Sequence, residues 1–113
     1  MNRGEVWEVN LDPTMGAEIQ KIRPCVIVSR DALASIDLRM VVPLTGWRED
    51  YASAPWIIPV DRTPANGLSK KSSADTFQVR SVSVKRLIRC LGRLPTERMT
   101  AISQGLKLSL ALD

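Results

Sequence analysis

Histidine is absent from this chain of 113 residues. Its absence removes the side chain that most often transfers protons near pH 7 and that most often binds transition metals. Any catalysis must therefore use other groups. We expect it to proceed without a metal ion or other cofactor.

Cysteine is also scarce, since only Cys25 and Cys90 occur. The two residues lie far apart, with no spacing typical of a metal site. Each falls in an apolar run of the sequence. We therefore expect both thiols to be reduced and buried.

Long hydrophobic runs are missing as well. No apolar stretch approaches the roughly 18 residues of a membrane span. The N-terminal residues also lack the cationic start, apolar run and cleavage site of a signal peptide. We expect a cytoplasmic protein without membrane attachment. The length of 113 residues predicts one domain over residues 1–113 that buries roughly two-thirds of its unfolded surface.

Positive charge prevails over negative charge, because 16 Lys and Arg stand against 12 Asp and Glu, for a net charge of +4. Many of the cations gather in one stretch: Lys70, Lys71, Arg80, Lys85, Arg86, Arg89 and Arg93. Such a cluster forms either a phosphate-facing patch or a solvated basic face, and charge alone does not decide between them.

Hydrophobic patterning predicts several short strands. Residues 5–9 alternate, with Trp7 and Val9 on one face of a half-buried strand. The apolar run of residues 24–28 indicates a central strand that begins at its proline. Further strands are predicted over residues 39–44, 56–60, 72–79 and 88–91, with Pro59 confining residues 56–60 to a sheet edge.

The pattern changes to a helical period from residue 96 onward. Apolar residues recur at spacings of three and four, at Met99, Ile102, Leu106 and Leu110. Glu97 suits the positive end of the helix dipole. Gly105 costs a helix about 1 kcal/mol relative to alanine, which predicts a close packing contact there. Five or six short strands followed by one helix predict a mostly β fold, a small barrel capped by the C-terminal helix.

Residues 11–24 form a long polar connection between the first two predicted strands. Connections of this length in a compact domain are usually binding loops or lids. The carboxylate of Glu18 and the guanidinium of Arg23 suit a site for a charged substrate.

Arg23 and Thr45 are candidates for binding one anionic group. If the second and third predicted strands are antiparallel neighbours, the start of one and the end of the other lie at the same sheet edge. Arginine offers a rigid fork of donors that matches phosphate, and a threonine hydroxyl donates to a phosphate oxygen. Taken singly, each residue is also an ordinary surface side chain.

The ordered set of these residues resembles the MazF/PemK (Kid) toxins. The likeness runs through residues 11–18, Lys21, Arg23 and Pro24, then residues 42–45 and 78–80, then Arg86, Leu87 and the leucine-rich helix. It covers nearly the entire chain. It implies an SH3-like barrel of the MazF/CcdB type, a homodimer, and metal-independent cleavage of single-stranded mRNA at a short specific sequence. It also implies that a MazE-like antitoxin neutralises the toxin.

By position, the resemblance assigns catalysis to Arg23, which stabilises the charge of the transition state, and to Thr45, which holds the phosphate. Glu18 matches a glutamate of the family's mobile loop. It either accepts a proton, orients Arg23, or is a solvated carboxylate. The residues expected to bind RNA are Lys21, Trp47, Gln78, Arg80 and Arg86.

Phe77 departs from the family pattern. Many relatives carry an acidic residue immediately before the glutamine that matches Gln78, and phenylalanine cannot transfer a proton. The reaction must therefore use Glu18 or Asp75, or rely on Arg23 with Thr45. We expect Phe77 in the core, the alternative being a platform that stacks on a base. Loop residues Trp47 and Tyr51, expected to be exposed, are better stacking candidates.

Two other functions stay open. CcdB toxins share the fold and poison DNA gyrase by protein binding, and a non-catalytic barrel would bind nucleic acid through its basic face. The Arg23 and Thr45 pair favours RNA cleavage over both. The antitoxin is expected to wrap residues 70–93 and the loop of residues 11–23 with an acidic segment that folds on binding.

Overall fold

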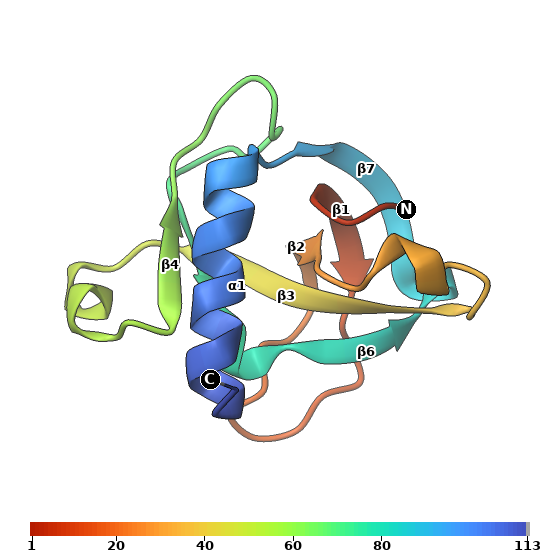
Figure 1. Ribbon diagram of the computed structural model, residues 1–113, viewed down its shortest axis with the longest axis horizontal. Coiled ribbons are helices and arrows are strands. Elements are labelled where there is room, and N and C mark those ends of the chain that lie inside the picture. The colour runs from red at the N-terminus through yellow and green to blue at the C-terminus, as the bar shows by residue number, and fades with distance from the viewer. Residues whose placement is uncertain (113) are drawn as a thin grey trace.

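The computed structural model describes residues 1–112. Its strands are β1 (Glu5–Asn10), β2 (Ile22–Ile27), β3 (Leu38–Gly46), β4 (Ile57–Val60), β5 (Ser72–Asp75), β6 (Arg80–Ser83) and β7 (Leu87–Arg93). One α-helix, α1 (Thr96–Leu110), follows them (Figure 1). Short 3₁₀ turns occur at η1 (Asp31–Leu33), η2 (Glu49–Ser53), η3 (Thr76–Gln78) and η4 (Val84–Arg86). The predicted mostly β fold with a C-terminal helix is confirmed.

The strands form one antiparallel sheet in the order β4-β5-β3-β2-β1-β7. Strand β3 runs through its centre. It pairs with β2 along one side, and along the other side with β6 first and then β5. Among the described residues the end strands β4 and β7 do not pair, so the sheet curls without closing into a complete barrel.

Apolar residues on the two faces of β1, β2 and β3 form two cores. The first core includes Val6, Val26 and Val42, and α1 covers it with Ile102. The second core includes Val9, Cys25 and Ile27 from the opposite face. Trp7 packs on the same core as Val9, as the alternation predicted, but β1 is covered on both faces rather than one.

Residues 72–79 do not form the single strand that was predicted, because η3 interrupts them. The carboxylate of Asp75 accepts a hydrogen bond from the N–H of Phe77 at 3.1 Å. The buried Thr76 donates to the Trp56 carbonyl at 2.6 Å and lies 2.9 Å from the Ser109 hydroxyl. These local side-chain bonds compete with the strand ladder and turn the chain. Strand β6 follows, in a stretch that was predicted to be a basic connection.

Strand β2 begins at Ile22, two residues before the predicted start at Pro24. Pro24 lies opposite Glu8 of β1, whereas pairing with β3 starts only at Cys25. The strand therefore has one neighbour at Pro24, which is a position where proline is tolerated. The predicted edge position of Pro59 is confirmed, because β4 ends the sheet.

Gly105 makes the close contact that its place in a helix predicted. A Cβ atom there would stand 2.8 Å from Cγ2 and 3.0 Å from Oγ1 of Thr76. Because Thr76 is fully buried, α1 packs this closely on η3 at residue 105 only with a glycine there.

The two cysteines differ in environment. Cys25 is buried, as expected, and burial raises the pKa of its thiol to about 12 against the opposing charge of Arg80. The prediction that Cys90 is buried is wrong, because Cys90 lies exposed on the edge strand β7.

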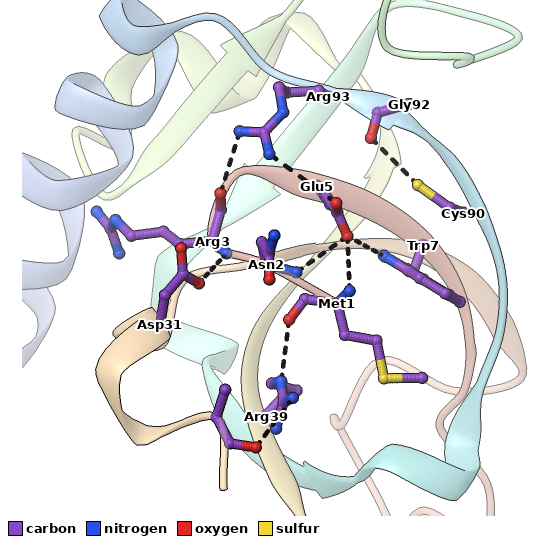
Figure 2. A network of polar contacts seen from close by, with 11 residues as sticks. Met1, Asn2, Arg3, Glu5, Trp7, Asp31, Arg39, Cys90, Gly92 and Arg93 are labelled. Carbon is purple, nitrogen blue, oxygen red and sulfur yellow. Dashed lines mark hydrogen bonds and ion pairs between the residues drawn. The ribbon is translucent and has the colours of Figure 1, made fainter.

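Glu5 ties the N-terminal residues to the sheet, as Figure 2 shows. Its carboxylate accepts from the indole N–H of Trp7 at 2.9 Å and from the N–H of Asn2 at 3.0 Å, and pairs with the N-terminal ammonium at 3.0 Å. Partial burial raises the pKa of Glu5, but these bonds outweigh it and lower the pKa from 4.5 to about 2.

No helix in residues 1–112 has the length and apolar character needed to cross a membrane.

Candidate active site

Arg23 lies at the start of β2, and Thr45 lies at the end of the neighbouring strand β3. Strands β2 and β3 are antiparallel neighbours, as predicted, and their register pairs Cys25 with Pro43. This pair is the last of the β2–β3 ladder, and Arg23 and Thr45 each lie two residues beyond it. Within residues 1–112 no hydrogen bond joins the two side chains, and Thr45 does not line the cavity at Arg23.

Arg23 keeps most of its hydrogen-bond donors uncommitted. Its half-buried guanidinium donates through Nε to the Gln20 carbonyl at 3.1 Å. Within residues 1–112 its terminal nitrogens make no further hydrogen bond. They face a shallow cavity of about 300 Å³ that Glu8, Ser69 and Arg89 also line. A guanidinium fork in such a position suits a phosphate group.

Thr45 is held by a residue that the sequence analysis did not single out. Its hydroxyl lies 3.1 Å from that of Ser73, its partner across the β3–β5 ladder. Ser73 donates to the Thr45 carbonyl at 3.2 Å. Ser73 has one proton and two acceptors within reach, the carbonyl and the hydroxyl of Thr45, and either hydroxyl can be the donor between the two side chains. When Ser73 donates to the Thr45 hydroxyl, the Thr45 proton is free for a phosphate oxygen. Only the pairing of β3 with β5 reveals this contact.

Glu18 lines a separate and larger hollow of about 450 Å³. One wall is the β1–β2 loop, here residues 11–21, and the other consists of η3 and the start of β6. The exposed Glu18 carboxylate accepts from the N–H of Met15 at 2.6 Å. Gln78 and Arg80 line the opposite wall, whereas Arg23 and Thr45 do not line this hollow. The structure therefore brings Glu18, Gln78 and Arg80 together at one hollow, whereas Arg23 lines another cavity and Thr45 lines neither.

The side chains of Gln78, Arg80 and Arg86, expected to bind RNA, contact the β1–β2 loop. Gln78 bonds the backbone of Ala17 and Ile19, Arg80 bonds that of Leu11, and Arg86 bonds that of Asn10 and Asp12. Lys21 is exposed, and its side chain makes no hydrogen bond within residues 1–112. Its backbone N–H donates to Asp12 Oδ1 at 3.0 Å.

Aromatic residues differ in exposure from the prediction. Phe77 is 71% exposed at the rim of the large hollow, so the expected core position is wrong. Trp47 and Tyr51 are half-buried and pack edge to face with centroids 5.9 Å apart. Lys71 lies 5.0 Å from the Trp47 ring centroid. Phe77 is therefore the more accessible stacking surface.

Carboxylates do not gather in a metal site. Residues 1–112 contain no group of three or more cysteine, aspartate or glutamate side chains that suits a metal ion. Burial raises the pKa of Asp75, against the opposing hydrogen bonds from the N–H groups of Phe77 and Gln78. That cleavage needs no metal stays a prediction.

Comparison with known proteins identifies the family. The family model of PemK-like, MazF-like toxins of type II toxin–antitoxin systems matches residues 2–110. The chain belongs to this family. The MazF-like toxin is 34% identical to endoribonuclease MazF9 of Mycobacterium tuberculosis over 119 aligned residues, covering 99% of this chain and 98% of that protein. The predicted family and enzyme class are confirmed.

Solved structures agree on the fold of this MazF-like toxin. MazF from Deinococcus radiodurans superposes with a TM-score of 0.83 at 20% identity and covers 99% of this chain and 97% of its own. Toxin MazF-mt6 of Mycobacterium tuberculosis gives 0.78 at 23% identity, with 96% and 98% covered. A mycobacterial endoribonuclease in complex with its cognate antitoxin gives 0.78 at 22% identity, with 100% and 97% covered.

Proposed function

We propose that this MazF-like endoribonuclease cleaves single-stranded mRNA at a short specific sequence, without a metal ion, at Arg23 and Thr45. The observation that supports this proposal is the antiparallel pairing of β2 with β3, because Arg23 and Thr45 each lie two residues beyond the last pair, Cys25 with Pro43. The terminal nitrogens of Arg23 and the hydroxyl of Thr45 are both suited to bind one phosphate. Cleavage of mRNA by the toxin stops translation and growth.

The reaction joins the 2′-oxygen of a ribose to its own 3′-phosphate. The 2′-hydroxyl gives its proton to a base as its oxygen bonds to phosphorus. The bond from phosphorus to the 5′-oxygen breaks, and this oxygen takes a proton. The products are a 2′,3′-cyclic phosphate and a 5′-hydroxyl, and no water is consumed.

Arg23 and Thr45 stabilise the charge that builds on the phosphate oxygens. Removal of one such donor typically lowers kcat by about 10²- to 10³-fold. A guanidinium has hydrogen-bond donors and no acceptor, so Arg23 is assigned to charge stabilisation rather than to proton removal. The base is assigned to Glu18, whose exposed carboxylate lines the hollow next to Gln78. Because this hollow is separate from the cavity at Arg23, the reacting nucleotide has to span both.

The experiment is cleavage of a mixed-sequence single-stranded RNA in EDTA, with both ends mapped by sequencing. We expect the wild type to cut at one short shared sequence and to leave 5′-hydroxyl ends. Arg23→Ala should lose at least about 10²-fold in cleavage rate. Arg62→Ala is the matched control, because Arg62 is an exposed arginine outside the site.

Two results would overturn the proposal. Equal cleavage by wild type and Arg23→Ala would remove Arg23 from the reaction. No cleavage by the wild type would favour the gyrase poison, which a supercoiling assay detects. Graded loss of RNA affinity in Arg23→Ala without any cleavage would instead indicate a barrel that only binds nucleic acid.

An antitoxin and a second copy of the toxin are the proposed protein partners, in the cytoplasm where mRNA is translated. A mycobacterial endoribonuclease of the same fold has been solved in complex with its cognate antitoxin. Lys70, Lys71 and Lys85 are exposed and suit an acidic, disordered segment. At low salt, Lys85→Ala with Lys71→Ala should weaken binding of an acidic antitoxin peptide. Unchanged binding would contradict this placement of the antitoxin.

The proposed homodimer is tested separately, by light scattering of the purified toxin.

A further inference from the structure

Two arginines that lie far from the β1–β2 loop in sequence hold the N-terminal end of this loop by hydrogen bonds. Arg80 of β6 donates to the Leu11 carbonyl at 3.1 Å. Arg86 of η4 donates to the Asn10 carbonyl at 3.1 Å and to the Asp12 carbonyl. The loop backbone also closes on itself, because the N–H of Leu11 donates to the Lys21 carbonyl at 3.0 Å.

Gln78 holds the other part of the loop, at the residues on either side of Glu18. Its side-chain Oε1 accepts from the N–H of Ile19 at 2.7 Å. Its Nε2 donates to the Ala17 carbonyl at 3.1 Å. A single side-chain amide thus satisfies one backbone donor and one backbone acceptor that flank Glu18, as a neighbouring strand would.

The tip of the loop depends on this contact. In the described structure, residues 14–19 make hydrogen bonds outside the loop only to Gln78. Their remaining bonds are local: the Glu18 N–H donates to the Met15 carbonyl at 3.2 Å, and the Glu18 carboxylate accepts from Met15. The side chain of Ile19 adds apolar packing on the second core.

We propose that Gln78 is a positioning residue that sets the place of Glu18 at the rim of the large hollow. This inference rests on the proposed function, because it assigns a task to Glu18 in RNA cleavage. It gives Gln78 a role different from direct RNA binding, since both polar atoms of its amide are engaged by the loop. A displacement of a reacting group by about 1 Å lowers the reaction rate by about 10²-fold.

The first test measures the loop without any substrate. Gln78→Met keeps the length of the side chain but removes both hydrogen bonds. We expect hydrogen exchange at the Ile19 amide to speed up about tenfold, as for the loss of one net hydrogen bond. The Leu11 amide, bonded to Lys21, should exchange as in the wild type and shows that the variant is folded. Gln104→Met on the exposed face of α1 is the matched control.

The second test is a double-mutant cycle on cleavage between Gln78→Met and Glu18→Ala. If Gln78 acts through Glu18, the double variant should cleave at the same rate as Glu18→Ala alone. We expect Gln78→Met by itself to lower kcat by about 10²-fold with little change in KM.

Three results would overturn this proposal while leaving the proposed function intact. One is unchanged exchange at Ile19 in Gln78→Met. Another is a double variant whose loss equals the product of the two single losses, which indicates a direct contact of Gln78 with RNA. The last is full cleavage by Glu18→Ala, which leaves Gln78 nothing to position; it also removes Glu18 as the base, while RNA cleavage at Arg23 and Thr45 stands. Absence of cleavage by the wild type would instead defeat the proposed function, and the exchange measurement would still report on the loop.

Discussion

The hydroxyl groups of Thr45 and Ser73 lie 3.1 Å apart across the β3–β5 ladder. Ser73 is only 1% exposed and also donates to the Thr45 carbonyl at 3.2 Å. A threonine hydroxyl that is hydrogen-bonded to a buried neighbour has a defined direction, and it keeps its own proton for a phosphate oxygen when the neighbour is the donor. The pairing of β3 with β5 therefore orients the group proposed to hold the scissile phosphate.

Ser73→Ala should lower kcat by about tenfold, because the Thr45 hydroxyl loses its buried hydrogen-bond partner and its preferred direction. Thr45→Val removes the hydroxyl itself and should cost about 10²- to 10³-fold. Initial rates on an RNA that contains the mapped cleavage sequence measure both effects. Ser73→Thr, which keeps the hydroxyl, should retain more activity than Ser73→Ala. Equal rates for wild type and Ser73→Ala would show that Thr45 needs no such support.

Gly105→Ala should destabilise the fold although alanine favours helices. Overpacking against the buried Thr76 costs about 1–3 kcal/mol, against a gain in helix propensity of about 1 kcal/mol. We expect a net loss of about 1 kcal/mol in the free energy of unfolding, measured in urea. Gln104→Ala, one residue earlier and exposed, should be neutral or slightly stabilising. A more stable Gly105→Ala would mean that α1 shifts freely from η3.

Glu5 should contribute stability that disappears in acid. Its folded-state pKa of about 2 lies below the ordinary 4.5, so the folded state favours the charged form. The contribution is present above about pH 4.5 and is lost as the pH falls through 2. With the carboxylate 20% exposed, solvent screening leaves it at about 1–2 kcal/mol.

Glu5→Gln tests this pH dependence through urea unfolding from pH 7 to pH 2. The variant should be less stable than the wild type at pH 7, and the gap should close as the pH falls. Glu97→Gln is the control, because Glu97 is exposed in the first turn of α1. A constant gap at every pH would show that the effect does not come from ionisation of Glu5.

Phe77→Ala should weaken RNA binding without harming the fold. The ring is 71% exposed at the rim of the hollow, and stacking on a base is worth about 1–3 kcal/mol. Fluorescence anisotropy with an RNA that carries a 2′-deoxy group at the cleavage position measures the affinity without cleavage. Ile88→Ala, 52% exposed on β7, is the control. Unchanged affinity in Phe77→Ala would remove it as a stacking platform.

Much of the fold was predictable because periodicity reports local burial. The apolar run before Ser29 marked β2, the stripe from Met99 marked α1, and Pro59 marked an edge strand. The error at residues 72–79 has a definite cause: the Asp75 cap and the contacts of Thr76 turn the chain at η3. The Asp75 cap is local but does not change the alternation of apolar and polar residues. The Thr76 contacts leave no trace in this alternation, because their partners lie far away in sequence.

The sequence by itself determined the family and the candidate residues. Ordered motifs, such as Arg23 with Pro24 and Thr45 after an apolar strand, can be recognised without knowledge of the fold. Only the tertiary structure decided what these residues touch. Gln78 bonds to Ala17 and Ile19, and Ser73 bonds to Thr45, although the partners lie far apart in the sequence. Hydrogen bonds extend over about 3 Å, so such partnerships depend on distances that strand register and chain turns create together.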